Sequence, residues 1–348
     1  MAEKIFKEEE VLKEEEILEG EYKAIAGAQI DEEEELLDKE NVVGVAIGHK
    51  IKEGKETGDP CITVLVSQKL DSALLKADDR VPKTVGKFKT DVFETGEIFA
   101  GNLIPEPVEE LAEVDTQVHA EVDIEALRGR LRPAKGGFSV GNFRITAGTI
   151  ATAVTDLGPF PGIPRRYYIL SNNHVLANSN NAFIGDPILQ PGRFDGGLNP
   201  RDRIARLSRF VPIRFMRPPL IPVNFVDAAI AEGQFSDLDR EIYWIGYVKG
   251  VRTVRIGQIV QKTGRTTNYT TGRVTTINAT INVNYGGGRV ARFARQIITT
   301  NMSRGGDSGS LLCDMNENAC GLLFAGSSRV TVHNNIFFVI RFLRIRIV

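Results

Sequence analysis

The pattern of apolar and polar positions changes character near residue 41. In residues 1–40, apolar residues such as Ile5 and Leu18 recur at near-helical spacing among glutamates and lysines. This pattern predicts an amphipathic helix, with breaks at Gly20 and Gly27, within an acidic and partly disordered segment. Beyond residue 41 the helical spacing gives way to short apolar runs separated by turn residues, which predict strands.

Residues 41–100 predict a small α/β module, and residues 101–132 predict a linker with a helical middle. The module's expected parts are strands at 42–48 and 61–66, a short helical or extended piece at 72–78 and a closing strand near 89–93. Neither region contains a Ser/His/Asp or Cys/His set of its own. We therefore expect no catalytic site in the first 132 residues, and we interpret His49 as a surface residue.

Residues 133–348 are rich in short apolar runs and turns. The run at 146–154 is almost continuously apolar, and the run at 167–171 leads into a polar turn. Many short strands with frequent turns favour a β-barrel or β-sandwich. The last apolar run, 334–343, is equally compatible with a helix and a strand.

Charge is unevenly distributed, although the chain carries a net charge of only −2. Residues 1–40 hold 16 Asp or Glu and 5 Lys, a net of −11, so the other 308 residues carry +9. Such an acidic run is either a solvated face or a clamp onto the basic body. The arginines are scattered without a recognition motif, which argues against nucleic-acid binding. No apolar run has the length of a membrane span, and the N-terminus lacks a signal-peptide profile, so a cytoplasmic location is expected.

The three cysteines have neither metal-ligand spacing nor the number needed for a disulfide framework. Cys313 and Cys320 flank a predicted hairpin loop, so they are expected to be cross-strand neighbours with reduced thiols. With four histidines and no HExxH pattern, zinc catalysis is not expected. We predict no metal and no cofactor.

The strongest chemical signal is the glycine-rich segment 304–312, which contains Gly306-Asp307-Ser308-Gly309. Glycines let the backbone turn sharply and bring its N–H groups close to a ligand. A serine on such a turn can lie beside two backbone donors suited to an oxyanion. The alternative is an ordinary β-turn with a solvent-facing serine. The motif resembles the nucleophile motif of the trypsin-like (chymotrypsin-fold) serine peptidases.

A serine nucleophile needs a base and a group that orients the base. His174 follows an apolar strand at a polar turn, and Asp227 lies inside an apolar run where its carboxylate needs hydrogen bonds. The order His174, Asp227, Ser308, with separations of 53 and 81 residues, is the chymotrypsin order. Asp186 and Asp195 remain alternative acids.

The chain is therefore similar to the bacterial type of trypsin-like peptidase, with an extra N-terminal module. The resemblance covers about residues 133–348 and includes the hairpin that contains Lys262-Thr263-Gly264-Arg265-Thr266-Thr267. It implies a mainly β fold of two six-stranded antiparallel barrels, at about 133–250 and 251–348. It also implies His174, Asp227 and Ser308 as the catalytic triad and the N–H groups of Gly306 and Ser308 as the oxyanion hole.

The same resemblance implies a substrate-binding strand and a side-chain pocket. Phe324, Ala325 and Gly326 would pair with the substrate backbone, and Met302 would line the pocket for the residue before the cleaved bond. Met302 carries no charge, so this residue is expected to be small or apolar. No Ile-Val-Gly-Gly start is visible, so a new N-terminus is not expected to switch Asp307.

The sequence thus predicts a serine endopeptidase acting on protein or peptide substrates, regulated by its N-terminal region. Residues 1–130 are also a candidate surface for homo-oligomer formation. The alternative is a catalytically silent peptide-binding or scaffold protein that assembles through the N-terminal module.

Overall fold

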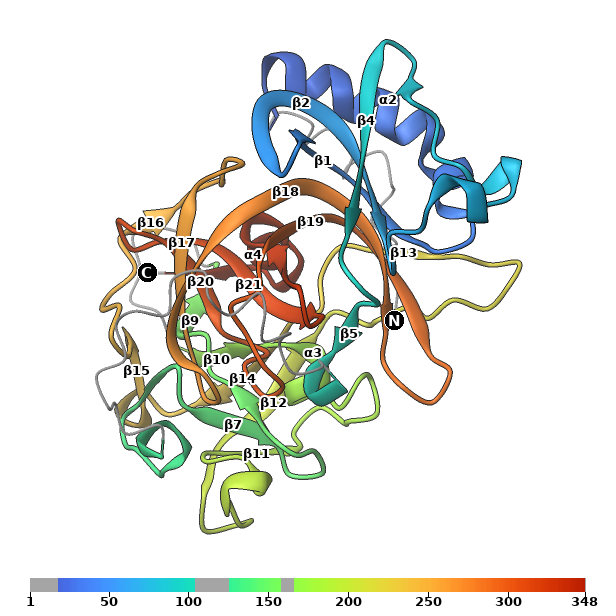
Figure 1. Ribbon diagram of the computed structural model, residues 1–348. Helices are drawn as coiled ribbons and strands as arrows, with labels where there is room; N and C mark the ends of the chain where they lie inside the picture. The colour runs from blue at the N-terminus through green and yellow to red at the C-terminus, as the bar shows by residue number, and fades with distance from the viewer. Residues whose placement is uncertain (1–17, 104–124, 158–165, 348) are drawn as a thin grey trace.

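Strands, mostly paired antiparallel, are the main secondary structure of the computed structural model, which describes residues 18–103, 125–157 and 166–347 (Figure 1). The strands form two barrels, and a module with one long helix lies against the second barrel. No helix in the described ranges is both long enough and apolar enough to cross a membrane. The predicted helical middle of the 101–132 linker falls largely on residues 104–124, which, like residues 1–17, lie outside the described residues.

Six antiparallel strands close the second barrel. They pair in the order β19–β22–β21–β20–β17–β18, and β18 pairs back onto β19. The strands are β17 (Ile259–Gly264), β18 (Asn268–Asn284), β19 (Val290–Thr300), β20 (Leu311–Asp314), β21 (Asn318–Gly326) and β22 (Val330–Asn335). Two short strands, β13 (Val223–Asn224) and β16 (Gly250–Val251), add in parallel to β19 and β21.

The first barrel closes through an interrupted strand. Its order is β9–β10–β14–β12–β11–β7, and β7 pairs with β8, which lies just before β9 in the chain. The strands are β7 (Ser139–Asn142), β8 (Gly148–Thr149), β9 (Ala153–Asp156), β10 (Tyr167–Ser171), β11 (Pro187–Leu189), β12 (Arg203–Phe210) and β14 (Ala229–Gly233). With β8 and β9 counted as one interrupted strand, this barrel also has six strands. The fold is chymotrypsin-like, as predicted.

Short elements connect the barrels. The helix α3 (Asn173–Leu176) follows β10, and α4 (Ile336–Leu343) leads to β23 (Ile345–Arg346), which pairs with β9 of the first barrel. The run left open between helix and strand is thus mainly a helix, capped where the Asn335 side chain accepts from Phe337 N. The other short elements are β6 (Ala134–Gly136), β15 (Leu238–Ile242), η6 (Ala126–Arg128), η7 (Arg193–Asp195) and η8 (Phe235–Asp237).

The N-terminal module is joined to the second barrel edge to edge. Its strand β1 pairs with β18, and the order continues β1–β2–β4–β3. The elements are α2 (Gly20–Leu37), β1 (Val42–Lys52), β2 (Lys55–Val66), η2 (Ser72–Leu74), η3 (Ala77–Asp79), β3 (Thr84–Val85) and β4 (Phe88–Glu94). The predicted break at Gly27 is wrong, because α2 runs through this position, where a side chain would meet open space.

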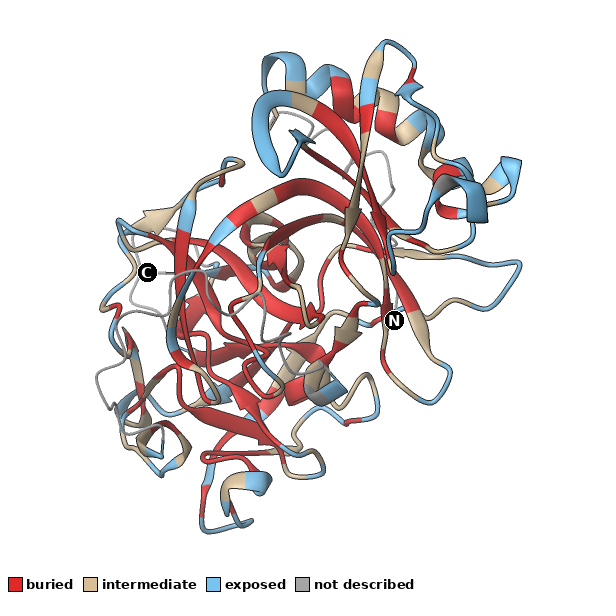
Figure 2. Ribbon diagram, viewed as in Figure 1, coloured by how far each residue is buried: buried red, intermediate tan, exposed pale blue. Residues whose placement is uncertain are grey.

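The apolar core is continuous from the module into the second barrel. Ile25 and Leu36 of α2 pack with Ile47 and Ile62 of the module sheet, and the same cluster includes Leu312 of β20. Figure 2 shows buried residues along the barrel strands and along one side of α2, whereas exposed residues follow the outer loops. The module therefore shares a core with the barrel.

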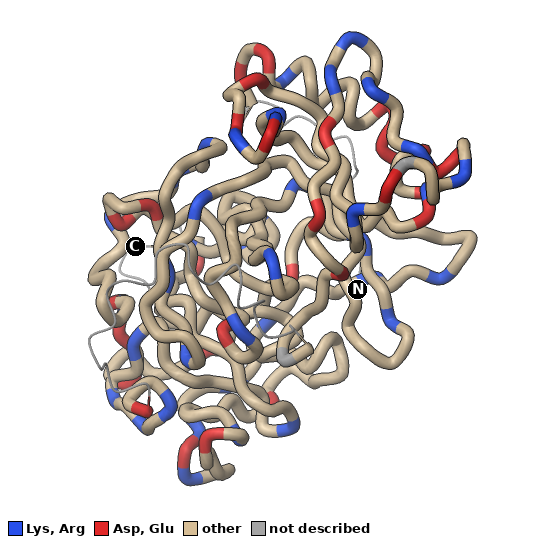
Figure 3. Tube along the Cα trace, in the orientation of Figure 1, with Lys and Arg blue, Asp and Glu red and all other residues tan. Residues whose placement is uncertain are grey.

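Charge also joins the module to the barrel. Acidic positions are frequent along α2, whereas basic positions are spread over the barrels (Figure 3). The carboxylate of Glu34 on α2 accepts two hydrogen bonds from Arg292 Nη1 of β19, at 2.8 and 2.7 Å. In the described part of the acidic segment, this contact joins α2 to a buried arginine of the second barrel.

The predicted cysteine hairpin is present as β20 and β21. Cys313 and Cys320 lie on these neighbouring strands, and both are free, buried thiols. Burial raises the pKa of Cys320 to about 12, and burial also raises that of Cys313 well above its usual value. Neither thiol is therefore ionised to a nucleophile at neutral pH.

Candidate active site

His174 and Asp227 meet at the ends of two strands of the first barrel. His174 lies on α3, directly after β10, and Asp227 lies just before β14, which pairs with β10. The Nδ1 atom of His174 is 2.6 Å from Asp227 Oδ2, and the backbone N–H of His174 donates to Asp227 Oδ1 at 3.2 Å. Asp227 is fully buried, so these bonds replace its contact with water. The contact leaves Nε2 as the imidazole nitrogen available for proton transfer.

Ser308 comes from the second barrel and lies against the same helix. A side-chain carbon added at Gly148 would meet both Val175 of α3 and the Ser308 carbonyl oxygen, so these groups surround one glycine. Ser308 Oγ and His174 Nε2 are buried and make no hydrogen bond within the described ranges. The serine hydroxyl is therefore not hydrogen-bonded to the imidazole in this structure. The structure brings together the histidine and the aspartate, with the serine on the neighbouring turn.

A buried ion pair holds the turn that carries Ser308. Lys262 Nζ lies 3.1 Å from Asp307 Oδ2, and both side chains are fully buried. Burial alone would raise the pKa of Asp307, but Lys262 and the donors Thr267, Arg304 and Thr266 hold that pKa below its usual value. Asp307 is thus an ionised turn stabiliser, and an internal lysine supplies the cation beside it.

The backbone around Ser308 is bonded to the first barrel. Thr149 Oγ1 donates to Gly306 O at 2.9 Å and accepts from Arg265 N at 3.1 Å. Gly306 has φ of +97°, and an added side-chain carbon would lie 2.5 Å from Arg265 Nη1. Only glycine suits this position. The turn that holds the predicted oxyanion donors Gly306 and Ser308 is therefore fixed by contacts from both barrels.

The predicted substrate edge of β21 is occupied by the chain itself. The short strand β5 (Phe99–Ala100) pairs antiparallel with β21, with Ala100 opposite Ala325 and Phe99 opposite Gly326. Its other edge pairs with β18, where Asn284 N donates to Ile98 O at 2.9 Å. This is the edge that the sequence assigned to a substrate backbone.

The residue after β5 lies against His174. Gly101 begins the turn η4 (Gly101–Leu103) with φ of +63°. A side-chain carbon at this glycine would lie 3.2 Å from His174 Cδ2 and 3.4 Å from Nε2. A cavity of about 170 Å³ continues beside this contact and is lined by His174, Leu103, Thr146 and Tyr285, among others. Access to His174 from this side runs past the chain's own segment.

The remaining predicted residues are buried around the second barrel. Met302 is buried, with its sulfur 2.7 Å from where a side chain on Gly272 would begin, and Phe324 is fully buried against Phe293. His333 is fully buried on β22 and contacts Thr299 Oγ1 at 3.1 Å.

The alternative acids do not contact His174. Asp195 pairs with Arg265 and accepts from Ser139, whereas Asp186 accepts from the backbone of Phe183. Of the three aspartates considered from the sequence, Asp227 is the one bonded to the imidazole.

Three residues around the site escaped the sequence analysis. They are Lys262 beside Asp307, Gly101 beside His174, and Tyr285, whose hydroxyl bonds Asp227. Lys262 lies in a segment that the resemblance marked as a hairpin. A lysine within a strand-like run was a usable signal of a buried charge that needs a partner. Gly101 and Tyr285 lie near strand ends with no spacing that links them to the motifs.

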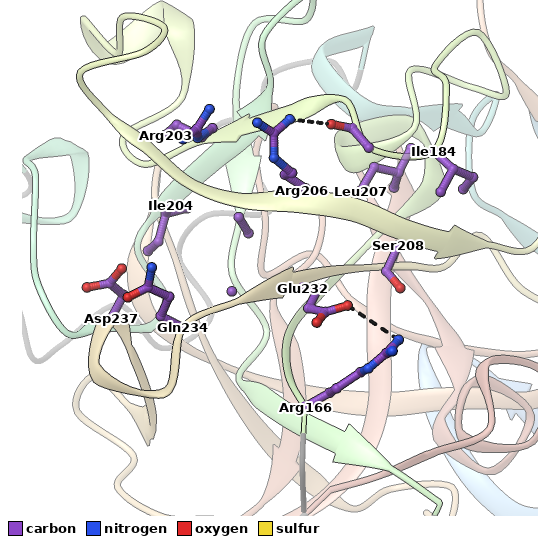
Figure 4. A pocket seen from close by; sticks show the side chains of 13 residues that line it. Arg166, Ile184, Arg203, Ile204, Arg206, Leu207, Ser208, Glu232, Gln234 and Asp237 are labelled. Carbon is purple, nitrogen blue, oxygen red and sulfur yellow. Dashed lines mark hydrogen bonds and ion pairs between the residues drawn. The ribbon is translucent and has the colours of Figure 1, made fainter.

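A larger cavity, of about 720 Å³, lies elsewhere on the first barrel (Figure 4). Arg166, Arg203 and Arg206 line it together with parts of β12 and β14, and Arg166 pairs with Glu232 at 3.7 Å. None of the predicted site residues lines this cavity. The candidate active site is therefore the buried contact between α3 and the two barrels.

Two curated bacterial serine proteases match part of this chain. Over 79 residues the chain is 42% identical to glutamyl endopeptidase 2 of Streptomyces griseus, a match to 23% of this chain and 34% of that protein. Over 82 residues it is 42% identical to serine protease 2 of Streptomyces fradiae, a match to 23% of this chain and 38% of that protein. The chain resembles the bacterial trypsin-like serine peptidases. It spans little more than a third of the length of these two relatives.

The N-terminal module matches a different family model. Residues 30–91 match the family model described as the NARROW LEAF 1 N-terminal domain, which falls on the end of α2 through β4. Protease A of Thermobifida fusca is a solved structure with a TM-score of 0.43 and 16% identity, covering 62% of this chain and 97% of its own. The chain thus has a segment that matches this family model and another part that resembles bacterial serine proteases.

Proposed function

We propose that this protein is a serine endopeptidase that hydrolyses peptide bonds in protein or peptide substrates. Ser308 is the nucleophile, His174 is the general base and acid, and Asp227 orients the imidazole. The observation that carries the proposal is the 2.6 Å contact between His174 Nδ1 and Asp227 Oδ2, made beside a Gly-Asp-Ser-Gly turn held by a buried ion pair. A neutral imidazole fixed in this way presents Nε2 as a proton acceptor.

The chemistry proceeds in two halves that share one base. Ser308 Oγ attacks the carbonyl carbon while its proton moves to His174 Nε2. The N–H groups of Gly306 and Ser308 stabilise the oxyanion, and loss of one such donor typically costs about 2.7–4 kcal/mol of transition-state stabilisation. The C–N bond then breaks as His174 returns the proton to the leaving amine. Water repeats the sequence on the acyl ester and frees Ser308.

We also propose that the N-terminal region regulates access to the site through β5. The support is that Phe99 and Ala100 pair with Gly326 and Ala325, the residues assigned to the substrate backbone. Gly101 lies over the His174 edge that would exchange the proton. A substrate strand must therefore displace β5, and a chain with β5 displaced should react faster than the wild-type chain.

The test of the catalytic proposal is labelling by a fluorophosphonate probe, which forms a covalent bond with an activated serine. We expect the label on Ser308 of the wild-type chain, located by mass spectrometry of its peptides, and no label in Ser308→Ala. The matched control Ser208→Ala removes a serine of β12 outside the site and should label like the wild type. Peptide hydrolysis by Ser308→Ala should fall to the residual level of about 10³–10⁴-fold over water.

Two observations favour the alternative of a catalytically silent peptide-binding or scaffold protein. The β21 edge already carries β5, and Ser308 Oγ makes no bond to His174. Absence of label both in the wild-type chain and in a chain with β5 displaced would support this alternative and overturn the enzyme proposal. A cytoplasmic location and self-association through residues 1–130 stay predictions.

A further inference from the structure

A tyrosine hydroxyl shares the carboxylate oxygen that holds the catalytic histidine. Tyr285 Oη donates to Asp227 Oδ2 at 2.7 Å, and the same oxygen lies 2.6 Å from His174 Nδ1. The tyrosine ring lies edge-on to the imidazole, with centroids 6.2 Å apart and planes at 77°. Tyr285 is thus in contact with both partners of the His–Asp pair.

Packing around the ring fixes the place of this hydroxyl. Tyr285 directly follows β18, and its backbone N–H donates to Arg289 O at 2.8 Å across the tip of the β18–β19 hairpin. Phe215 packs edge-on against the ring at 5.4 Å, and Phe293 stacks on it at 6.2 Å. The hairpin and these aromatic neighbours therefore position the hydroxyl independently of the histidine.

The environment also keeps the hydroxyl a donor. Burial, together with the charge of Asp227, raises the pKa of Tyr285 well above its usual value, so the phenol stays protonated at neutral pH. Asp227 is fully buried and accepts from His174 N, from His174 Nδ1 and from Tyr285. A buried carboxylate that loses one such donor is less well stabilised and less well oriented.

We propose that Tyr285 is a positioning residue of the triad, which acts by holding the Asp227 carboxylate in the orientation that His174 requires. This inference rests on the proposed peptidase function. Because the hydroxyl is bonded to Asp227 and not to a substrate, its loss should affect the chemical step more than substrate binding. The hairpin that carries Tyr285 also pairs with β1 through Gly44 and Val45, so the N-terminal module supports this contact.

The experiment compares Tyr285→Phe with a matched control. Tyr168→Phe also removes a buried tyrosine hydroxyl that donates to a carboxylate, in this case Asp156 Oδ2 at 2.7 Å. We expect Tyr285→Phe to lower kcat for p-nitrophenyl acetate about ten- to a hundredfold with KM changed less than about twofold. We expect Tyr168→Phe to leave both constants within about twofold of wild type, because the chemical step does not use this hydroxyl.

A spectroscopic readout needs no turnover. The Nδ1–H proton of His174 reports its bond to Asp227, so its NMR resonance should shift in Tyr285→Phe and stay in place in Tyr168→Phe. If Tyr285→Phe fails to fold, 3-fluorotyrosine at position 285 keeps the shape and makes the phenol a stronger donor. The same resonance should then shift, whereas 3-fluorotyrosine at position 168 should leave it unchanged.

The outcomes separate the two proposals. Ester hydrolysis that survives in Ser308→Ala would overturn the peptidase function. Hydrolysis that depends on Ser308 but keeps its kcat in a folded Tyr285→Phe would overturn the positioning role alone. An unmoved Nδ1–H resonance with the fluorinated residue at position 285 would overturn it as well.

Discussion

At the scale of residues, a buried ion pair stabilises the turn that carries Ser308. Lys262 and Asp307 form a fully buried ion pair, and removing one partner of such a pair typically destabilises a protein by about 3–5 kcal/mol. The lysine lies within the chain, so this pair requires no newly cut N-terminus. The turn carrying Ser308 is therefore organised in the uncut chain.

The buried His333 predicts how stability depends on pH. Burial, and to a smaller extent Lys262, lowers the pKa of His333 from 6.5 to about 3. Between these values the unfolded chain binds more protons than the folded chain, so the free energy of unfolding should fall as pH falls. One such group contributes up to about 1.4 kcal/mol per pH unit.

Urea denaturation between about pH 7 and pH 4 measures this slope. The range stays above the lowered pKa of Asp307, so that carboxylate remains ionised throughout. We expect the slope for His333→Gln to be smaller than the wild-type slope by about one proton. Equal slopes for the two proteins would contradict the assignment of a neutral, buried imidazole.

The sequence could single out His174, Asp227 and Ser308 as candidates because each interrupts a local pattern. A histidine at a polar turn, an aspartate in an apolar run and a serine between glycines are readable without coordinates. Tyr285 could not be found in this way. A tyrosine at a hairpin tip is compatible with many roles, and its bond to Asp227 exists only because β18 and β19 run far enough to reach the first barrel.

At the scale of elements, β5 occupies the edge of β21 that the sequence assigned to a substrate backbone. This strand has two residues, too few for a pattern of alternation to predict. The sequence predicts that the module's last strand ends near residue 93 and that residues 101–132 form a linker. Residues 99–100 form a strand because they pair with β18 and β21, and their own composition does not predict it. By contrast, the six strands of the second barrel have strong turn signals between them.

A methyl group at Gly101 should weaken the pairing of β5 with β21. Gly101 has φ of +63°, and an added carbon would lie 3.2 Å from His174 Cδ2. We expect Gly101→Ala to raise the rate of fluorophosphonate labelling about tenfold, because a non-glycine residue in this conformation costs roughly 1–2 kcal/mol.

The control variant for β5 is Gly86→Ala. Gly86 has φ of +54°, with no atom within 4 Å of an added carbon. The variant therefore adds similar backbone strain outside β5 and η4. Its labelling rate should match that of the wild-type chain. A Gly101→Ala chain that labels no faster than Gly86→Ala would count against regulation by β5.

At the scale of the whole molecule, the module and the second barrel form one continuous sheet. The sequence predicted the module's strands but not this junction, because an edge-to-edge pairing depends on which strand edge is free after both parts have folded. Gly44 marks the junction. A side-chain carbon there would lie 2.6 Å from Ile281 Cγ2 and 2.9 Å from Thr280 O.

Gly44→Ala should therefore lower the stability of the whole chain. Overpacking of a buried contact typically costs about 1–3 kcal/mol, and the loss should appear as a lower Tm. Gly27→Ala is the matched control in α2, where the added carbon meets open space, and it should raise stability by about 0.5–1 kcal/mol. Equal Tm values for the two variants would show that the β1–β18 contact contributes little.

The covalent attachment of β5 has a consequence for the search for ligands. A tethered segment competes at an effective concentration that is on the order of millimolar for short flexible links, and this value does not fall on dilution. A free peptide with micromolar intrinsic affinity would therefore score as a weak binder in a screen against the intact chain. Under the proposed regulation by β5, reagents that react irreversibly accumulate each time β5 leaves β21, so they are better suited than equilibrium binding to identify what the β21 edge accepts.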